Sequence, residues 1–462
     1  MLKNRRLNTF VVAMLWLLGA GLAIGFAAAD TELQSAVGAV QTIYREGVPH
    51  TDHRGRPMLK YDARRSFFPI GMWGAPLPAG ACGRKYDWQV LVDAGYNTVW
   101  PWYKPAADSL EAGAEHNLQI VLMGEQDSAT LSVIENHPNL LGNMTLDEPI
   151  GKLESGNMEQ MFADFLAYKK LAEGIAPDML VFVNDAPWIV APATEWWIRW
   201  NSAGDVSCHD NYPIWPVTRS LNFGTSGSMP NGIPQSVALG VKANEQRNPV
   251  WLLVGAWEDL DPPTARYPFR YPTPMQLRAL VYAGIIHGAT GIHYFIWDSY
   301  ISRGGRVVGM SPDPPITHVP LPRQNGNPPP SPATPTQLVM ARAAWDTAAL
   351  INKELQQLTP VILSPTVGPE LEYSVTLEGQ TVTDSPIRAL LKPHPEGGYV
   401  LLTVNLDNAV VVATYSFDRT LSRAEAVFEN REDPAVKLEG VRFAEDYEPF
   451  ETHIYRITFQ SP

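Results

Sequence analysis

The sequence predicts a (β/α)8 barrel followed by a separate antiparallel β-sandwich domain, an α/β chain overall. Two patterns support this fold class. In the first part of the chain, short apolar runs alternate with helical segments, as they do in parallel sheets built from βα units. From about Val361 onward, strand-like runs are instead separated by Gly, Asp, Asn and Pro. A chain of 462 residues that is 45% hydrophobic is long enough to form more than one domain.

Eight apolar runs occur in order, and each is predicted to be one strand of the barrel. A barrel of this kind needs roughly 250 residues or more, which the span of these runs satisfies. Helices are predicted between them, most clearly over Glu159–Leu171 and Pro274–Ile286, and Thr336–Leu355 is predicted to close the barrel. The eight runs are Phe67–Met72, Thr98–Trp100, Leu118–Met123, Leu140–Leu146, Met179–Val183, Asp205–Cys208, Val250–Ala256 and Gly291–Ile296.

The predicted domain organisation has four segments. Residues 1–29 form an export signal, residues 30–66 an N-terminal segment with a hairpin over Val40–Tyr61, residues 67–357 the barrel, and residues 361–462 the β-sandwich. A segment rich in Pro, Gly and Asn, Arg303 to Pro335, follows the eighth run and should lie on the face of the barrel where the strands end. The strands predicted in the C-terminal domain are Leu371–Val375, Ile387–Leu391, Tyr399–Val404, Ala409–Tyr415 and His453–Phe459.

The N-terminus and the charge restrict where the protein works and what it binds. Basic residues, an apolar run over Phe10 to Phe26 and three alanines before Asp30 predict cleavage after export, and hence a secreted or periplasmic protein. The alternative is an uncleaved segment, which would be the one contact with a membrane. A formal charge of −13 excludes a nucleic-acid partner and favours a neutral substrate. Cys82 and Cys208 are the two cysteines, and we expect separate thiols in preference to a pair.

Two acidic residues and a proline directly follow the fourth run. Barrel enzymes carry their catalytic groups where strands end, and glycoside hydrolysis needs one carboxyl group that protonates the departing oxygen. We therefore predict that Glu148 is a proton donor and that Asp147 orients a sugar hydroxyl. The alternative is a helix N-cap, because acidic residues before Pro149 would suit the positive end of a helix.

The second carboxyl group of such a mechanism has two main candidates. Glu258 follows the seventh run and is predicted to be the nucleophile, although Asp259 and Asp261 crowd the same segment and would hinder its ionisation. Asp210, after the sixth run, is the competing candidate for the nucleophile. If it is not the nucleophile, we predict that it binds substrate. Weaker candidates after the third and eighth runs are Glu125 and Asp298.

Aromatic residues gather at the predicted strand ends, where their faces would pack on sugar rings, although ordinary core packing is the alternative for each. Tyr212 is predicted to donate its hydroxyl to the nucleophile, and His293 to bind a sugar hydroxyl. The sequence has no HExxH motif, P-loop or dinucleotide-binding fingerprint, so we expect no metal and no cofactor. The tryptophans predicted to bind substrate are Trp73, Trp102, Trp257 and Trp297.

Three segments resemble the retaining (β/α)8 glycosidases of the large clan of cellulases, β-galactosidases and agarase-like enzymes. The resemblance covers roughly Val40 to Leu355. Two positions differ from the clan: Asp147 stands where an Asn is usual, and Val254 to Trp257 intervene before Glu258. The segments are Arg56-Pro57-Met58 with Phe68 to Trp73, Leu140 to Gly142 with Asp147 to Pro149, and Leu277 to Leu280 with Gly288 to Trp297.

The resemblance implies a retaining mechanism with Glu148 as acid/base and a Glu after the seventh strand as nucleophile. The sequence therefore predicts an exported glycoside hydrolase that cleaves β-glycosidic bonds of an oligo- or polysaccharide. The alternative is a carbohydrate-binding protein without catalysis on the same scaffold.

Overall fold

The structure of the chain is a computed structural model, which describes the residues in the following ranges. They are 67–75, 87–102, 105–187, 193–214, 220–221, 223–226, 229–244, 248–259, 269–298, 300–302, 305–310, 334–364, 371–382 and 385–461. The predicted export signal, the predicted hairpin over Val40–Tyr61, Cys82 and most of the Pro-rich segment lie outside these ranges.

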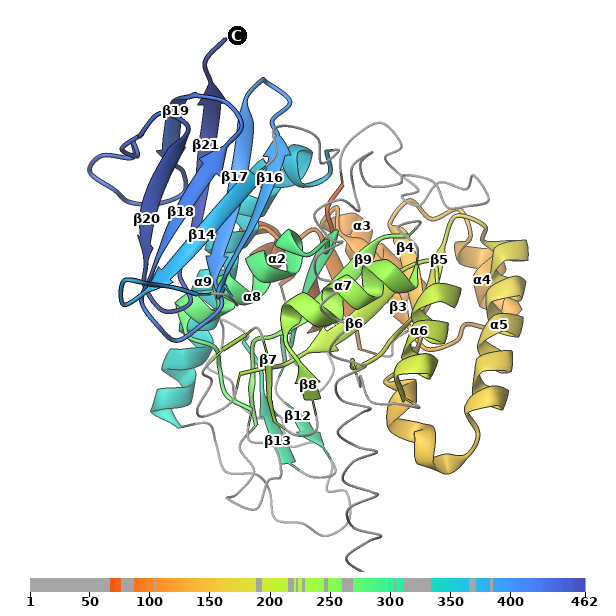
Figure 1. Ribbon diagram of the computed structural model, residues 1–462. Helices are drawn as coiled ribbons and strands as arrows, with labels where there is room; N and C mark the ends of the chain where they lie inside the picture. The colour runs from red at the N-terminus through yellow and green to blue at the C-terminus, as the bar shows by residue number, and fades with distance from the viewer. Residues whose placement is uncertain are drawn as a thin grey trace, which may run out of the picture.

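Eight parallel strands form a closed barrel in the order β1-β11-β9-β6-β5-β4-β3-β2 (Figure 1). Each of the eight predicted runs is a barrel strand, so this part of the prediction is confirmed. The largest shift is in the first run, where the strand begins at Ile70 and continues to Ala75. The strands are β1 (Ile70–Ala75), β2 (Thr98–Pro101), β3 (Gln119–Met123), β4 (Leu140–Asp147), β5 (Leu180–Asn184), β6 (Ser207–Asn211), β9 (Val250–Gly255) and β11 (Gly291–Phe295).

The barrel interior is filled by aromatic side chains. The Trp100 ring meets the rings of Phe182 and Trp251 edge-on, with centroids 5.6 and 6.3 Å apart. His293 lies in the same layer, with no exposed surface, and accepts a hydrogen bond of 3.0 Å from Trp100 Nε1 at its Nδ1. A Cβ on Gly71 would overlap the His293 ring, so a glycine is needed there. The interior is thus a packed core, and ligands must bind at the mouth.

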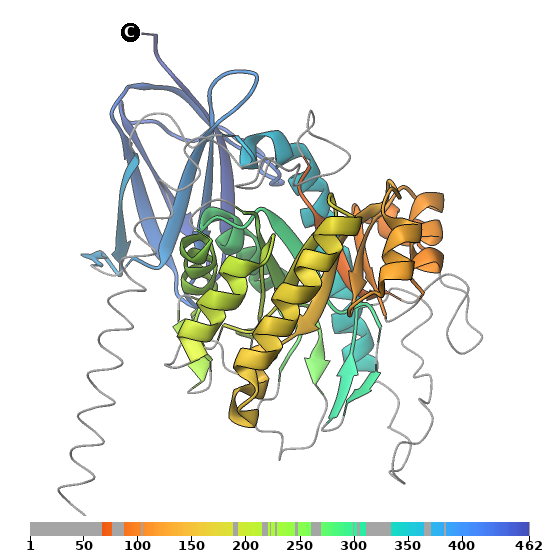
Figure 2. The ribbon, with the colours of Figure 1, turned by 90° about the vertical axis from the view of Figure 1, so that its right-hand side faces the viewer.

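Helices surround the barrel and confirm the predicted βα alternation (Figure 2). Pro274–Ile286 forms α8 as predicted, whereas α9 continues to Ile362 and includes Pro360 in its last turn. Capping boxes at Thr273 and Thr334 begin these two helices. The helices are α2 (Gln89–Asp93), α3 (Ala106–Glu115), α4 (Ser128–Ile134), the 3₁₀ helix η1 (Pro149–Ser155), α5 (Met158–Ile175), α6 (Ala193–Ala203), α7 (Ile233–Ala243), α8 (Pro274–Ile286) and α9 (Pro335–Ile362).

Short strands that the sequence did not indicate lie outside the barrel. A two-stranded sheet pairs β7 with β8, and a three-stranded sheet has the order β10-β13-β12. Each of these five strands has only two to four residues, which is too short for an alternation of apolar and polar residues to be visible in the sequence. They are β7 (Phe223–Ser226), β8 (Met229–Asn231), β10 (Glu258–Asp259), β12 (Tyr300–Ser302) and β13 (Gly305–Val308).

The C-terminal part forms two antiparallel four-stranded sheets, in the orders β15-β14-β18-β20 and β16-β17-β21-β19, which enclose an apolar core. This arrangement confirms the predicted β-sandwich. β19 and β20 are rich in charged residues, and their buried positions do not alternate strictly with exposed ones, which is why these strands were not predicted. The strands are β14 (Leu371–Leu377), β15 (Gln380–Thr381), β16 (Ile387–Pro393), β17 (Tyr399–Asn405), β18 (Val411–Phe417), β19 (Leu421–Ala426), β20 (Arg442–Tyr447) and β21 (Thr452–Phe459).

The β-sandwich packs directly against the outer helices of the barrel (Figures 1 and 2). Leu402 and Val404 of β17 belong to the same buried apolar cluster as Leu280 of α8 and Leu355 of α9. Because α8 is covered by the barrel on one side and the sandwich on the other, it is apolar on nearly every face. Within the described ranges, none of the helices has both the length and the apolar character that crossing a membrane would require.

Candidate active site

Acidic and amide side chains from three neighbouring barrel strands meet at the mouth of the barrel. Asp147 and Glu148 are at the end of β4, Asn184 is at the end of β5, and Asp210 is in β6. Because β4, β5 and β6 are adjacent and parallel, the carboxyl ends of these strands lie side by side. We call Asp147, Glu148, Asn184 and Asp210 the carboxylate cluster.

The backbone at Glu148 has an unusual conformation for a residue with a side chain. Its φ of 45° and ψ of 56° lie in the left-handed region. Its amide donates a 2.8 Å hydrogen bond to the carbonyl of Asn184, which ties the turn to β5. Backbone strain of this kind concentrates at functional sites, where it sets the direction of a side chain.

The structure does not support the alternative role of Glu148 as a helix cap. Glu148 occupies the N-cap position of η1, with Pro149 as the first residue of that helix, but its side chain makes no capping hydrogen bond. The carboxyl group instead makes a hydrogen bond with Asp210. Its conformation therefore serves the carboxylate cluster and not the helix.

Burial and mutual repulsion raise the pKa of several carboxyl groups in the cluster. The Asp147 and Glu148 side chains are exposed at the mouth, although many protein atoms surround their carboxyl groups. Burial, followed by the negative charge of Asp147, raises the pKa of Glu148 to about 7, although the hydrogen bond with Asp210 opposes this. Burial also raises the pKa of Asp147, against the effect of the Asn184 amide.

Asp210 is the most enclosed carboxyl group of the cluster, with 2% of its surface exposed. Burial, and then the charges of Glu148 and Asp147, raise the pKa of Asp210 well above its ordinary value. Two carboxyl groups in direct contact cannot both ionise without a large cost, so one of Glu148 and Asp210 keeps a proton while the other is ionised. A pair of this kind can supply one acid and one carboxylate for the same reaction.

Asn184 connects the cluster through one amide group. Its Nδ2 donates to Asp147 Oδ1 at 3.0 Å and to Asp210 Oδ1 at 2.9 Å. The buried thiol of Cys208 lies 3.7 Å from the Asn184 Oδ1, within the range for a sulfur donor. This contact holds the amide with its nitrogen toward the two carboxyl groups.

Asp185 is a buried carboxyl group next to the cluster that sequence reasoning missed. Its Oδ1 accepts a 3.2 Å hydrogen bond from the amide of Ile150, whereas its Oδ2 is buried without a hydrogen-bond partner. Burial raises the pKa of Asp185 well above its ordinary value, against the Ile150 hydrogen bond, and the charge of Asp210 raises it further. Asn184 and Asp185 directly follow the fifth apolar run, so their position in the sequence was the signal that could have found them.

Glu258, the predicted nucleophile, lies in β10 of the small outer sheet and not in a barrel strand. Its Oε1 accepts hydrogen bonds from Arg270 Nη1 at 2.8 Å and from Gln337 Nε2 at 3.2 Å. At the end of the seventh barrel strand the inward position is instead Gly255, where a Cβ would lie 2.8 Å from the Tyr212 ring. The structure thus brings Asp210, and not Glu258, into contact with Glu148.

Two predicted aromatic residues, Tyr212 and Trp257, meet near the end of the sixth barrel strand. The Tyr212 ring contacts Trp257 and Phe295 with centroids 5.9 and 5.5 Å apart, and the Trp257 ring lies 4.9 Å from that of Phe269. Tyr212 and Phe295 are half-buried and therefore present part of their surface outward. These rings form an aromatic wall at the mouth.

Other predicted substrate-binding residues differ in accessibility. Trp102 is half-buried, whereas Trp73 is 2% exposed and stacks on Trp100 with centroids 4.7 Å apart. His293 is enclosed in the barrel interior, and burial lowers its pKa to about 3, so it is a neutral core residue. Trp297 is also buried and packs edge-on against Trp345 of α9. His293 and Trp297 do not reach the mouth, because their side chains point into the interior and toward the helices.

No protein-family model matches the sequence, and no curated protein sequence matches it either. Among the described residues, no group of three or more His, Cys, Asp or Glu side chains is arranged to hold a metal ion.

Solved structures do resemble this fold. A β-galactosidase from Bacillus circulans sp. alkalophilus aligns with a TM-score of 0.51 and 9% identity, over 86% of this chain and 100% of that one. A β-galactosidase from the psychrophilic Marinomonas ef1 aligns with a TM-score of 0.42 and 12% identity, over 63% of this chain and 60% of that one. This chain therefore spans less than two thirds of the Marinomonas protein. The endo-β-1,4-mannanase from Thermotoga petrophila aligns with a TM-score of 0.39 and 10% identity, over 86% of this chain and 96% of that one. The expected likeness to the barrel fold of a β-galactosidase is therefore confirmed, and at 9% identity it is a likeness of fold.

Proposed function

We propose that the protein is a glycoside hydrolase that cleaves β-glycosidic bonds of an oligo- or polysaccharide, with Glu148 as its proton donor. The observation that carries the proposal is the contact of Glu148, whose pKa is raised to about 7, with the buried Asp210, which lies two strands away in the barrel. A general acid works best when its pKa is near the working pH. The predicted export of the protein is part of the same proposal.

The proposed reaction uses the proton that Glu148 and Asp210 share. Glu148 gives the proton to the departing glycosidic oxygen while the Asp210 carboxylate forms a bond to the anomeric carbon, and the bond between that carbon and the departing oxygen breaks. Water then attacks the anomeric carbon of the glycosyl-enzyme, Glu148 accepts a proton from the water, and Asp210 leaves as a carboxylate. Overall, one water molecule is consumed for each bond cleaved.

The closeness of the two carboxyl groups favours retention of configuration. Retaining enzymes have their carboxyl groups about 5–5.5 Å apart, and inverting enzymes about 6.5–9.5 Å apart, to leave room for water. Glu148 and Asp210 are close enough to form a hydrogen bond, which leaves no room for a water molecule between them. A bound sugar would replace this hydrogen bond and move the two carboxyl groups apart to the separation that retaining enzymes have.

Asp210 is preferred to Glu258 as the nucleophile because of what surrounds each group. Burial and the charges of Glu148 and Asp147 raise the pKa of Asp210, but the hydrogen bond from Asn184 opposes this and stabilises the ionised form that a nucleophile needs. Glu258 is already bound by Arg270 and Gln337. A carboxylate bound to a cation is a weaker nucleophile and would have to give up this ion pair to act.

The aromatic wall supports a saccharide substrate. Sugar rings have apolar faces of C–H groups, which pack on aromatic planes, and hydroxyl groups, which need polar partners. Tyr212 and Phe295 provide such surfaces at the strand ends, and we propose that Asp147 orients a sugar hydroxyl. Trp102 and Trp257 contribute further aromatic surface at the same mouth.

A carbohydrate-binding protein without catalysis is the second candidate. The observation that favours it is Gly255, which leaves the end of the seventh strand without a carboxyl group. In this case the cluster would bind sugar hydroxyls and would not transfer a proton.

The test is Glu148→Gln, assayed on aryl β-glycosides and on neutral polysaccharides by release of chromophore or reducing ends. The amide has the shape of the acid but no proton to give, so turnover should fall about 10²–10⁴-fold. Glu115→Gln at the end of α3 is a matched control and should have normal turnover. Normal turnover by Glu148→Gln would exclude Glu148 as the donor, and no turnover by the unsubstituted protein on any substrate would favour the binding role.

A further inference from the structure

A second cavity lies between the barrel and the β-sandwich. Its volume is about 580 Å³, within the roughly 300–1,000 Å³ typical of small-molecule sites, which are common at domain interfaces. It shares no lining residue with the carboxylate cluster. We call it the interdomain cavity, and it is lined by Met275, Arg278, Glu429, Asn430, Arg431, Glu445, Asp446, Phe450, Glu451, Thr452 and His453.

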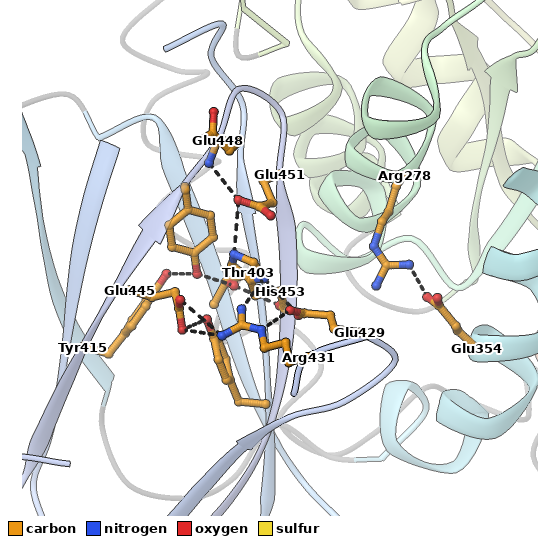
Figure 3. A network of polar contacts seen from close by, with 12 residues as sticks. Arg278, Glu354, Thr403, Tyr415, Glu429, Arg431, Glu445, Glu448, Glu451 and His453 are labelled. Carbon is orange, nitrogen blue, oxygen red and sulfur yellow. Dashed lines mark hydrogen bonds and ion pairs between the residues drawn. The ribbon is translucent and has the colours of Figure 1, made fainter. Parts of the chain in front are cut away.

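One wall of the interdomain cavity is a rigid network of ion pairs in the β-sandwich (Figure 3). Arg431 donates from Nε to Glu429 at 2.6 Å, and its Nη1 lies 3.2 Å from Glu445. The His453 ring lies between Glu429, 2.9 Å from its Nδ1, and Glu451, 3.4 Å from its Nε2. Side chains held by several partners lose little further entropy when a ligand binds.

The protonation state of this wall is also set by the network. Burial alone would lower the pKa of His453, but hydrogen bonds and charge from Glu429 and Glu451 outweigh it and raise the pKa to about 9. At neutral pH, four carboxylates in the lining therefore face three cations among the described residues. This near balance disfavours a strongly charged ligand of either sign.

Three polar groups of the lining have hydrogen-bonding capacity that the described residues do not use. Arg278 binds Glu354 through Nη1, but its Nη2 is buried and has no hydrogen-bond partner. Leaving a buried charged donor unpaired is costly, which favours an additional acceptor next to Arg278. Asp446 and Asn430 have exposed side chains without a hydrogen bond or ion pair to another described residue.

We propose that the interdomain cavity is a second carbohydrate-binding site, which holds a neutral segment of a polysaccharide. Hydroxyl groups both donate and accept hydrogen bonds, so one saccharide could accept from Asn430 and donate to Asp446. Met275, which is 40% exposed, offers an apolar surface for the C–H groups of a sugar. The choice of a saccharide as the ligand rests on the proposed function.

The position of the interdomain cavity suits a chain that also reaches the barrel mouth. Met275 and Arg278 are in the first turns of α8, which follows the seventh barrel strand. In a (β/α)8 barrel, a helix that follows a strand begins on the face where the strands end, which is the face of the carboxylate cluster. A bound polysaccharide would therefore be kept near the mouth while its bonds are cleaved.

The experiment is affinity electrophoresis of the full chain in native gels that contain a neutral polysaccharide. Galactomannan, mixed-linkage β-glucan, galactan and arabinoxylan are the probes, and all proteins carry Glu148→Gln to prevent hydrolysis. We expect at least one probe to retard this protein. Asn430→Ala with Asp446→Ala should weaken that retardation about tenfold, as expected for the loss of two hydrogen bonds. Glu432→Ala removes an exposed charge next to Arg431, outside the lining, and is the matched control with unchanged retardation.

Three results would overturn the proposal. They are no retardation by any of the four probes, equal retardation of the double variant and its parent, and equal weakening by Glu432→Ala. Thermal midpoints equal to that of the parent would show that the double variant is folded. Turnover of aryl β-glycosides by the unsubstituted protein tests the proposed function separately, because these small substrates do not extend to the interdomain cavity.

Discussion

The side-chain amide of Asn184 lies 2.9 Å from Asp210 Oδ1 and donates a hydrogen bond to it. The same nitrogen donates to Asp147 at 3.0 Å, so one amide stabilises the ionised form of two carboxyl groups on opposite sides of it. Cys208 holds this amide in place from the strand that also carries Asp210. Asn184 is therefore a positioning residue for the proposed nucleophile.

Asn184→Ala should reduce kcat by about 100-fold, because a small displacement of a reacting group is enough for such a loss. It should also raise the pKa of Asp210 further, since the amide now lowers it. The acid limb of the profile of kcat/KM against pH should therefore move to higher pH. A fall in activity with an unchanged acid limb would mean that Asn184 only supports the fold. Cys208→Ser, which keeps a donor toward the amide, should be close to the parent.

Asp147→Asn should move the alkaline limb of the same profile to lower pH. Glu148 must be protonated to act as the acid, so activity falls as the pH rises through its pKa of about 7. Burial is the larger cause of the raised pKa of Glu148, and the charge of Asp147 is the second. Removing that charge should therefore lower the pKa, but not to its ordinary value. An alkaline limb that stays in place would show that Glu148 is not the group that titrates.

Asp210→Asn and Glu258→Gln distinguish the two candidate nucleophiles. Asp210→Asn should lower kcat at least about 10³-fold, as the loss of an essential nucleophile does. Glu258→Gln should keep activity but lower the free energy of unfolding by about 1 kcal/mol, because Arg270 loses a partly exposed ion pair. The measurements are steady-state kinetics and chemical denaturation of both variants. The reverse pattern would assign the nucleophile to Glu258.

His453 should make the protein less stable at alkaline pH. Its pKa in the folded chain is about 9, above the value of 6.5 expected when unfolded, so the folded state binds the proton more tightly. The stabilisation is complete below pH 6.5 and is lost as the pH rises to 9, with a total of about 3 kcal/mol.

Chemical denaturation of the parent and of His453→Gln between pH 6 and pH 10 checks this prediction. The parent should lose stability across the window, and the variant should be less stable at pH 6 with a flatter curve. His116→Gln, at the end of α3, is the control and should follow the parent. Parallel curves for the parent and His453→Gln would contradict the assignment.

The barrel and the place of Glu148, the proposed proton donor, were visible in the sequence because they depend on local patterns. A buried parallel strand needs a continuous apolar run, as in Val250–Ala256, and a strand end places the next polar residue at the mouth. Asp147 and Glu148 follow such a run directly, so their place was readable. The aromatic residues at other strand ends were readable in the same way, although not whether each of them faces the mouth.

The second carboxyl group was not readable, because it depends on contacts between distant segments. A shift of one residue at the end of the seventh strand decides which side chain faces inward. The structure places Gly255 there, and Glu258 is turned toward Arg270 and Gln337 of α9. His293 was predicted at the mouth, but Gly71 opens a space for it in the barrel core.

By itself, the sequence determined the order of strands and helices, the barrel with its β-sandwich, and the place of Glu148, since apolar periodicity is a local property of the chain. Only the tertiary structure decided that Glu148 contacts Asp210, that Asn184 joins the cluster, and that Arg278 and Asp446 line one cavity. The physical reason is that burial and charge are set by groups far apart in the chain. These long-range contacts raise the pKa of Glu148 and turn a strand-end residue into a candidate acid.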